Sequence, residues 1–371
     1  MKRKKILFLI GKYGTGGKER QLSEIIAGLP KENYELYLFM KSCETYYIEK
    51  IQDRIIKVYN LEKPNFFLSD IFKLKNIITQ ISPDIIFSLS KTTSHFALIL
   101  KLLFRKKYRL LNASIRNAPK MFTINLKIER ILYNYYNEVV SNSHAGLIAY
   151  RQLGKKGRHI LHNGFNMNRV PIDSKFALKQ ILGLQDKFTV IMIGRMSHRK
   201  DQITFIKAVN NILNNRSDFQ FILIGDGPKR LQYENLINDL NINNQVIILS
   251  EVDNVESYFM ASDISVLTSA PHHGEGIPNV ILESMACGTP VIASDNGGTK
   301  EILKHNYNGL MINNGDFESL AKKITFLKDH PNMLDYLSHN GIETVRDCFS
   351  TERMISGFES IINDSYNNFI T

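Results

Sequence analysis

The sequence predicts an α/β protein made of two Rossmann-like domains, each built on a parallel sheet. Short runs of aliphatic, β-branched and aromatic residues alternate with longer segments whose apolar residues recur at helical spacing, which is typical of βαβ units. This alternation stops at Val170-Pro171-Ile172-Asp173 and then starts again. The chain has 371 residues, which is long for one domain and ordinary for two.

The first domain is expected over residues 1–169. Its predicted strands are Lys5–Ile10, Glu35–Met40, Ile55–Val58, Asp84–Leu89, Arg109–Ile115 and Glu138–Ser141. Its predicted helices are Lys18–Leu29, Leu68–Gln80, Ser94–Phe104 and His144–Leu153.

The second domain is expected over residues 174–350, and a helix over 351–371 is expected to pack back toward the first domain. Its predicted strands are Thr189–Gly194, Phe219–Ile224, Val246–Leu249, Ile264–Leu267, Val291–Ala293 and Gly309–Ile312. Its predicted helices are Gln202–Leu213, Lys229–Leu240, Val255–Ala261, Pro278–Ala286 and Phe317–Lys328, with two or three more to follow. Because ligands bind beyond the carboxyl ends of such strands, we expect a ligand site in a cleft between the domains.

The composition indicates a folded intracellular protein. Hydrophobic residues make up 43% of the chain, enough for a large core. Cys43, Cys287 and Cys348 lie far apart, which argues against a disulfide framework or a zinc cluster and favours a reducing compartment. No run of about 18 apolar residues is present, and Lys2–Lys5 precede only a short apolar run, so we expect a cytoplasmic protein without a signal peptide or membrane span.

Charge is distributed unevenly along the chain. Residues 1–165 hold 29 Lys and Arg against 12 Asp and Glu, a net charge of +17, whereas residues 166–371 hold 18 against 24, a net charge of −6. A basic first half suggests an anionic partner, such as a phospholipid surface at the inner face of the membrane, a phosphorylated acceptor or nucleic acid. The alternative is a basic surface that only confers solubility.

Two carboxylates stand eight positions apart around the start of a predicted helix. Pro278 suits the first turn of this helix, and Gly288 followed by Pro290 ends it. Glu275 then lies in the loop before the helix and Glu283 within its apolar stretch. Carboxylates only accept hydrogen bonds and therefore suit a ligand with many hydroxyls. The alternative is one buried, satisfied Glu and one solvated Glu.

A second candidate site follows the strand Thr189–Gly194. Arg195 and Lys200 lie just beyond its end, and Asp201 can cap the helix that starts at Gln202. The planar fork of Arg and the point charge of Lys suit a diphosphate. The alternative is a solvated basic turn.

Several motifs together resemble the retaining glycosyltransferases of family 4, which have the GT-B fold. The segment Glu275–Glu283 matches their pair of Glu residues separated by seven positions, and the match continues through Cys287–Ser294 to Gly297-Gly298. Upstream matches are Asn163–Phe165, Gly194–Lys200, Gly225–Pro228 and Ala261–Ile264. The resemblance is strong over residues 157–314 and weaker in the first half, where Gly16-Gly17 is the main point of contact.

This resemblance implies a donor site and its chemistry. Arg195 and Lys200 would hold the diphosphate of a nucleotide-sugar and stabilise the charge that develops on the leaving group. Glu275 would accept hydrogen bonds from the transferred sugar and Glu283 from the ribose. The backbone of the turn would close around sugar and phosphate; this turn is Gly276, Ile277, Pro278 and Asn279. The implied catalytic residues are Arg195, Lys200 and Glu275.

The first domain matches the family less completely. Gly16 and Gly17 follow the first strand and resemble the family loop that touches donor phosphates and acceptor; the alternative is a plain turn. Many members carry a His after a strand of this domain, but here the strand Arg109–Ile115 runs into Arg116 and Asn117. We therefore take Arg116 and Asn117 as candidates on the acceptor side.

No metal or other cofactor is expected. His272 and His273 beside Glu275 lack a Cys or Asp at ligand spacing, and the chain has no Asp-x-Asp. The apolar and basic segment Leu98–Arg109 could lie on an anionic bilayer or could pack as an ordinary helix. No recognition motif supports nucleic-acid binding.

The leading interpretation is a retaining hexosyl- or N-acetylhexosaminyl-transferase. It would use a UDP- or GDP-sugar and a glycan acceptor, lipid-linked, in the synthesis of a bacterial surface polysaccharide or glycoconjugate. A non-enzymatic sugar or nucleotide-binding module and a nucleotide-sugar epimerase are the alternatives. A dehydrogenase is disfavoured because neither domain has the glycine fingerprint of dinucleotide binding.

Overall fold

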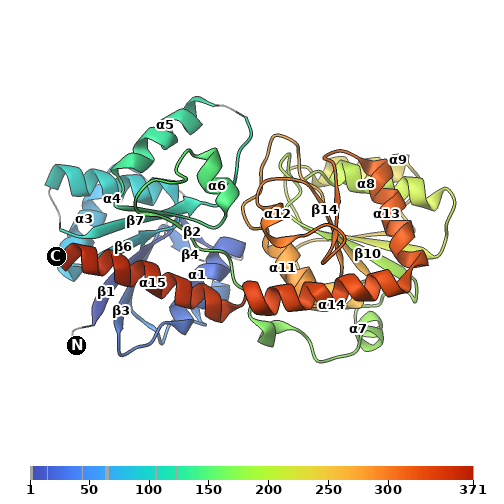
Figure 1. The fold of residues 1–371 in the computed structure, drawn as a ribbon, viewed down its shortest axis with the longest axis horizontal. Coiled ribbons are helices and arrows are strands. Elements are labelled where there is room, and N and C mark those ends of the chain that lie inside the picture. Colours follow the sequence, from blue (N-terminus) through green and yellow to red (C-terminus); the bar gives the residue numbers. More distant parts are fainter. Residues whose placement is uncertain are drawn as a thin grey trace. The chain divides into compact units, whose positions relative to one another are not determined.

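A computed structural model describes residues 3–14, 16–43, 45–62, 67–104, 107–121 and 123–370. The chain forms two compact units, each an α/β sandwich (Figure 1). The first unit comprises Met1–Arg116, Phe122–Gly164 and Thr351–Thr371, and the second comprises Asn117–Met121 and Phe165–Ser350.

The first unit is built on a parallel sheet of seven strands in the order β5-β3-β1-β6-β7-β8-β9. The strands are β1 (Lys4–Leu9), β3 (Tyr34–Met40), β5 (Ile55–Asn60), β6 (Ile85–Ser88), β7 (Arg109–Ile115), β8 (Glu138–Ser141) and β9 (Arg158–Ile160). A separate pair joins β2 (Lys12–Tyr13) to β4 (Ser42–Cys43). The strand order reverses beside β1, so the loop after β1 lies at the switch point of this sheet.

Alternate residues of β1 face opposite cores, as the pleat of a strand requires. Ile6 and Phe8 join a core covered by α1, α2 and α15, while Leu7 and Leu9 join a core covered by α3, α4 and α6. The helices of this unit are α1 (Gly17–Gly28), α2 (Thr45–Ile48), α3 (Asp70–Ile81), α4 (Lys91–Phe104), α5 (Ile124–Leu132), α6 (His144–Ala149) and α15 (Thr351–Ile370), with a 3₁₀ turn η1 (Tyr133–Tyr135).

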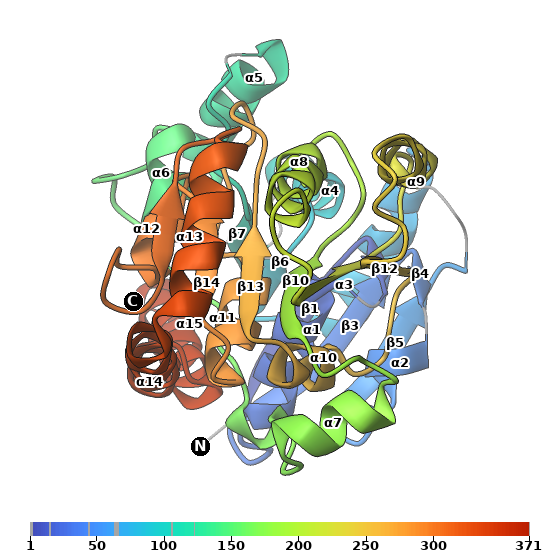
Figure 2. The same ribbon diagram turned by 90° about the vertical axis from the view of Figure 1, so that its right-hand side faces the viewer.

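The second unit has a six-stranded parallel sheet in the order β12-β11-β10-β13-β14-β15, and its order reverses beside β10. The strands are β10 (Phe188–Ile193), β11 (Phe219–Ile224), β12 (Val246–Leu249), β13 (Ile264–Leu267), β14 (Val291–Ser294) and β15 (Leu310–Ile312). One face packs on α8, α9 and α13 and the other on α10 and α11 (Figure 2). Its helices are η2 (Met167–Arg169), α7 (Lys175–Ile181), α8 (Gln202–Leu213), α9 (Arg230–Asp239), α10 (Val255–Ala261), α11 (Asn279–Ala286), α12 (Thr299–Ile302), α13 (Phe317–Asp329) and α14 (Pro331–Cys348).

The chain passes between the units at 116/117, 121/122, 164/165 and 350/351, and the last two of these connections are neighbours. The amide of Phe165 donates to the carbonyl of Phe349 at 2.8 Å, so the two connections lie side by side. The division falls at 164/165, earlier than the linker expected at Val170–Asp173, because Phe165 and Val170 pack into cores of the second unit. The last helix α15 packs on α1 of the first unit.

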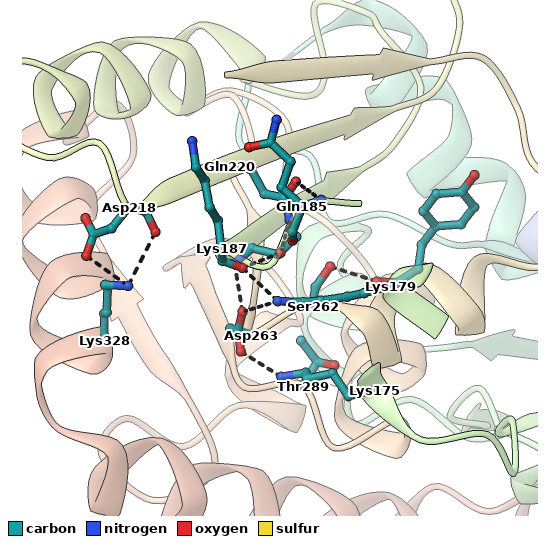
Figure 3. Close-up of polar contacts among 12 residues, drawn as sticks. Lys175, Lys179, Gln185, Lys187, Asp218, Gln220, Ser262, Asp263, Thr289 and Lys328 are labelled. Carbon is teal, nitrogen blue, oxygen red and sulfur yellow. Dashed lines mark hydrogen bonds and ion pairs between the residues drawn. The ribbon is translucent and has the colours of Figure 1, made fainter. Parts of the chain in front are cut away.

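The amino ends of the second sheet are fastened by Asp263, which belongs to the motif Ala261–Ile264. Its carboxylate accepts from the amide of Thr189 at 2.7 Å and from the ammonium of Lys175 on α7 at 2.8 Å (Figure 3). Because Asp263 precedes β13, this network lies at the edge opposite the strand ends where a ligand is expected. We therefore assign this motif a structural role.

Among the described residues, no helix has both the length and the apolar character needed to cross a bilayer.

Candidate functional site

The candidate site lies at the carboxyl edge of the second sheet, where the strand order reverses. Arg195 and Lys200 follow β10, and Glu275 follows β13, which pairs with β10. The loops after two neighbouring parallel strands meet at one edge, and this is where open α/β sheets bind ligands. As predicted, Asp201 caps α8, because its carboxylate accepts from the amide of Thr204.

Lys200 and Glu275 form a largely buried ion pair. The Nζ of Lys200 lies 2.7 Å from Oε1 of Glu275, and the two side chains are 18% and 12% exposed. The hydroxyl of Ser269, just after β13, donates to the same carboxylate oxygen at 2.9 Å. The structure thus brings together two residues that are 75 positions apart in the sequence.

The ion pair determines the charge of Glu275. Burial alone would raise the pKa of its carboxyl group, but the ammonium of Lys200 and the hydroxyl of Ser269 outweigh burial and hold the pKa below its ordinary value. Glu275 is therefore an ionised acceptor at neutral pH. Burial and the nearby cations Arg199 and Lys200 lower the pKa of His273, despite the opposing effect of Glu275, so this imidazole is neutral at pH 7.

Arg195 is exposed at the end of β10, and the backbone beside it is held by two glycines. Gly225 has φ +145°, and a Cβ there would lie 2.2 Å from the carbonyl oxygen of Gly194. Gly227 has φ +150°, and its Cβ would lie 2.3 Å from the carbonyl oxygen of Met196. The motif Gly225–Pro228 therefore contains glycine because the backbone after β11 packs directly against the backbone that carries Arg195.

Backbone from two further segments supports the loop that carries Glu275. Asn117 pairs with Glu275 in an antiparallel bridge, and the amide of Ala118 donates to the carbonyl of Gly274 at 2.9 Å. On the other side, the amide of Gly298 donates to the carbonyl of Glu275 at 2.9 Å. The position of Glu275 is thus set by main-chain contacts that sequence spacing does not reveal.

Glu283 lies in α11 as predicted, and its side chain is buried. The helix begins at Asn279, one residue after the predicted Pro278, which is its N-cap. The turn Gly276–Asn279 therefore connects the ion-paired Glu275 directly to the first turn of α11.

Of the remaining predicted residues, Gly16, Gly17 and Arg116 belong to the first unit and Asn117 to the second. Gly16 is the N-cap of α1, and Gly17 is the first residue of that helix. Arg116 donates to the side-chain oxygen of Asn163 at 2.9 Å, and burial lowers the pKa of its guanidinium to about 10, so it stays protonated at neutral pH. Arg116 and Asn117, adjacent in sequence, thus belong to different units, and each contacts a residue of its own unit.

The sequence reasoning missed Ser269 and Asn296. The amide group of Asn296 donates to the carbonyls of Ala270 and His273 at 3.0 and 2.6 Å and so ties down the loop before Glu275. Each lies within three positions of the end of a predicted strand, and a polar residue so close to a strand end is the signal that could have found them.

Two further expectations concern metals and membranes. No three His, Cys, Asp or Glu side chains within the described ranges are placed to hold a metal ion. In the segment Leu98–Arg109, Leu102 and Leu103 are exposed on α4, while Arg105 and Lys106 lie outside the described residues.

The fold and the comparisons with known proteins indicate the class of protein. Two Rossmann-like units, each built on a parallel sheet, are the architecture of the GT-B fold. Residues 174–344, within the second unit, match the family of glycosyl transferases group 1. This chain is therefore a glycosyltransferase of the GT-B fold.

Two relatives show how far the similarity extends. An α-1,4-N-acetyl-D-galactosaminyltransferase of Campylobacter jejuni, which acts on a diNAcBac-PP-undecaprenol-linked glycan, is 25% identical over 92% of this chain and 94% of its own length. A lipopolysaccharide core biosynthesis glycosyltransferase of Rhizobium meliloti, LpsD, is 33% identical over 49% of this chain and 48% of its own.

Solved structures share the fold over the whole chain. HepE of Anabaena, in complex with UDP and glucose, has a TM-score of 0.83 at 22% identity, covering 98% of this chain and 100% of its own. Sucrose-phosphate synthase of Thermosynechococcus elongatus has a TM-score of 0.81 at 20% identity, covering 99% and 100%.

Proposed function

We propose that this protein is a retaining, metal-independent transferase of family 4. It moves a hexosyl or N-acetylhexosaminyl group from a UDP- or GDP-sugar to a glycan acceptor on a lipid carrier. The observation that carries the proposal is the buried pair of Lys200 and Glu275 at the switch point of the second sheet, 2.7 Å apart.

In this proposal Lys200 and Arg195 bind the donor diphosphate. Breaking the bond between the sugar and the diphosphate leaves negative charge on the leaving oxygen, and fixed cations stabilise that charge. A preorganised donor of this kind lowers a barrier by roughly 3–4 kcal/mol. No acid is then needed to protonate the leaving group, and no bound metal is needed to neutralise it.

Glu275 acts as an acceptor for sugar hydroxyls. Its lowered pKa supports this role, because an ionised carboxylate cannot supply the proton that a glycoside hydrolase takes from its general acid. Lys200 and Ser269 both donate to Oε1 of this carboxylate, and Oε2 is proposed to accept from the donor sugar. Glu283 is proposed to hold the ribose, and Gly16, Gly17, Arg116 and Asn117 are proposed to serve donor and acceptor binding.

The choice of donor and acceptor is supported by relatives. HepE binds UDP-glucose, and an Escherichia coli relative, 27% identical over 55% of this chain, is a UDP-Gal:α-D-GlcNAc-diphosphoundecaprenol α-1,3-galactosyltransferase. The C. jejuni relative also acts on an undecaprenol-linked glycan. We propose a similar acceptor here, reached at the cytoplasmic face of the membrane.

A thermal-shift screen against UDP-, GDP- and ADP-sugars tests the proposal first. One nucleotide-sugar should raise the melting temperature, and turnover of that donor should require an acceptor. Conversion of the sugar without any acceptor would indicate an epimerase instead, and binding without turnover in the presence of lipid-linked glycans would indicate a binding module.

A further inference from the structure

Helix α5 of the first unit presents a row of isoleucines to solvent. Ile124, Ile128 and Ile131 are 76%, 48% and 52% exposed. Their spacing of four and three residues places them on one face of the helix. The opposite face supplies Leu126 and Glu129 to the interior, so packing on the unit does not require the exposed row.

The α6–β9 turn extends this face with basic residues. The guanidinium of Arg130 donates to the carbonyl of Ala149 at 2.7 Å, and the ammonium of Lys155 donates to the side chain of Asn134 at 2.8 Å. These contacts hold the turn beside the carboxyl end of α5 (Figure 1). Arg151 and Lys156 of the turn are exposed, as is Lys127 on α5.

The acidic residues of this region do not offset that charge at the surface. Residues 107–165 contain ten Lys and Arg but only Glu129 and Glu138 as acids. Both acids are buried: Glu129 lies 3.5 Å from Lys91, and Glu138 lies 2.6 Å from Arg109. The exposed charge around the isoleucine row is therefore positive.

We propose that the α5 surface, consisting of Ile124, Ile128, Ile131, Lys127, Arg151 and Lys156, docks on an anionic lipid bilayer. An apolar stripe bordered by cations fits the boundary between acyl chains and anionic headgroups, where the isoleucines enter and the cations stay at headgroup level. Charge complementarity favours this partner over a second copy of the chain, whose α5 surface would carry the same positive charge. The inference extends the proposed function, which places the acceptor on a lipid carrier, and locates the docking surface on α5.

Co-sedimentation of the full chain with vesicles tests the proposal. The wild-type protein should bind vesicles containing phosphatidylglycerol and should not bind pure phosphatidylcholine. Ile124→Ser/Ile128→Ser should weaken binding roughly tenfold or more because apolar burial is lost. Lys127→Gln/Lys156→Gln should weaken it about 30-fold at low salt and less at high salt, since each basic residue near the surface contributes roughly fivefold.

A matched control comes from the second unit. Ile181 on α7 is 70% exposed, similar to the residues of the α5 row, and Ile181→Ser should leave vesicle binding unchanged. Equal binding by wild type and the double isoleucine variant would overturn the proposal. The proposal would also be overturned if the wild type did not bind vesicles but formed a dimer by light scattering, and if this dimer dissociated in the double isoleucine variant.

Donor binding separates this inference from the proposed function. Thermal shifts by nucleotide-sugars should be the same in wild type and both α5 variants, because the candidate donor residues lie in other elements. If the wild type bound no nucleotide-sugar but still bound anionic vesicles through α5, the proposed function would fail and the docking surface would stand.

Discussion

At the scale of single residues, the pairing of Lys200 with Glu275 links stability to pH. Glu275 is held ionised in a largely buried position by one ammonium and one hydroxyl. Because its folded pKa is depressed, the pair stabilises the fold above about pH 4.5, and this stabilisation is lost as the pH falls through the folded pKa.

Lys200→Ala should therefore destabilise the protein in a pH-dependent way. At pH 7 the loss should be about 3 kcal/mol, because Glu275 is left as an unpaired buried charge. The difference from wild type should shrink below pH 4.5, where Glu275 is protonated in the variant. Urea unfolding at pH 7 and pH 4 measures both values. A loss that does not change with pH would contradict the assigned ionisation.

Adding Glu275→Gln to Lys200→Ala gives the matched control. The second change removes the unpaired charge and should recover part of the stability at pH 7 without restoring turnover. If the double variant were no more stable than Lys200→Ala, the ion pair would not explain the loss.

Glu283→Ala should mainly weaken donor binding. The proposed bond to the ribose is to a charged acceptor, and such bonds contribute about 1.5–3 kcal/mol, so the donor dissociation constant should rise roughly ten- to a hundredfold. Isothermal titration with the preferred nucleotide-sugar measures it. An unchanged constant in a folded variant would remove Glu283 from the ribose role.

At the scale of elements, glycines place the loops around the site. Gly297 and Gly183 have similar left-handed φ values, +56° and +65°. A Cβ at Gly297 would lie 2.2 Å from the carbonyl oxygen of Glu275, whereas a Cβ at Gly183 would meet no atom within 4 Å. Comparing substitutions at these two positions therefore distinguishes the effect of backbone strain from the effect of contact with the loop that carries Glu275.

Gly297→Ala should lower both stability and turnover, because the loop carrying Glu275 must move. Gly183→Ala should cost only about 1 kcal/mol, the penalty for a left-handed alanine, and should leave turnover unchanged. Thermal unfolding and donor turnover of both variants provide the comparison. If the two changes had equal effects on stability and turnover, the contact between Gly297 and Glu275 would not matter for turnover.

The elements themselves could largely be predicted from the sequence. The predicted strands Phe219–Ile224 and Val246–Leu249 have the observed bounds, because short β-branched runs between polar turns leave little choice. Helix α5 was missed because its apolar row, Ile124, Ile128 and Ile131, is largely exposed and so does not mark a buried face. Strand β9 was missed because it has only three residues, Arg158–Ile160, which is too short for a strand pattern to be visible in the sequence.

Within the site, residue types were predictable but their partners were not. The direct pair of Lys200 and Glu275 depends on β10 lying beside β13, which follows from the reversal of strand order and not from spacing along the chain. The contact between Asn117 and Glu275 depends on a five-residue segment that leaves the first unit and returns.

At the scale of the whole molecule, the proposed reaction needs no bound metal. Cations of the chain would neutralise the departing diphosphate, so turnover should be unchanged, within about twofold, after dialysis against EDTA. Adding Mg²⁺ back should produce no large increase. A loss of turnover with EDTA that Mg²⁺ or Mn²⁺ restores would show that the protein side chains alone do not provide this charge.

The most direct test of the central claim is nucleotide release from the preferred nucleotide-sugar, with acceptor present, by wild type and Lys200→Ala. Lys207→Ala, at an exposed lysine on α8, serves as the control. We predict that turnover falls by about a hundredfold or more in folded Lys200→Ala and is unchanged in Lys207→Ala. Near-normal turnover by Lys200→Ala would contradict it.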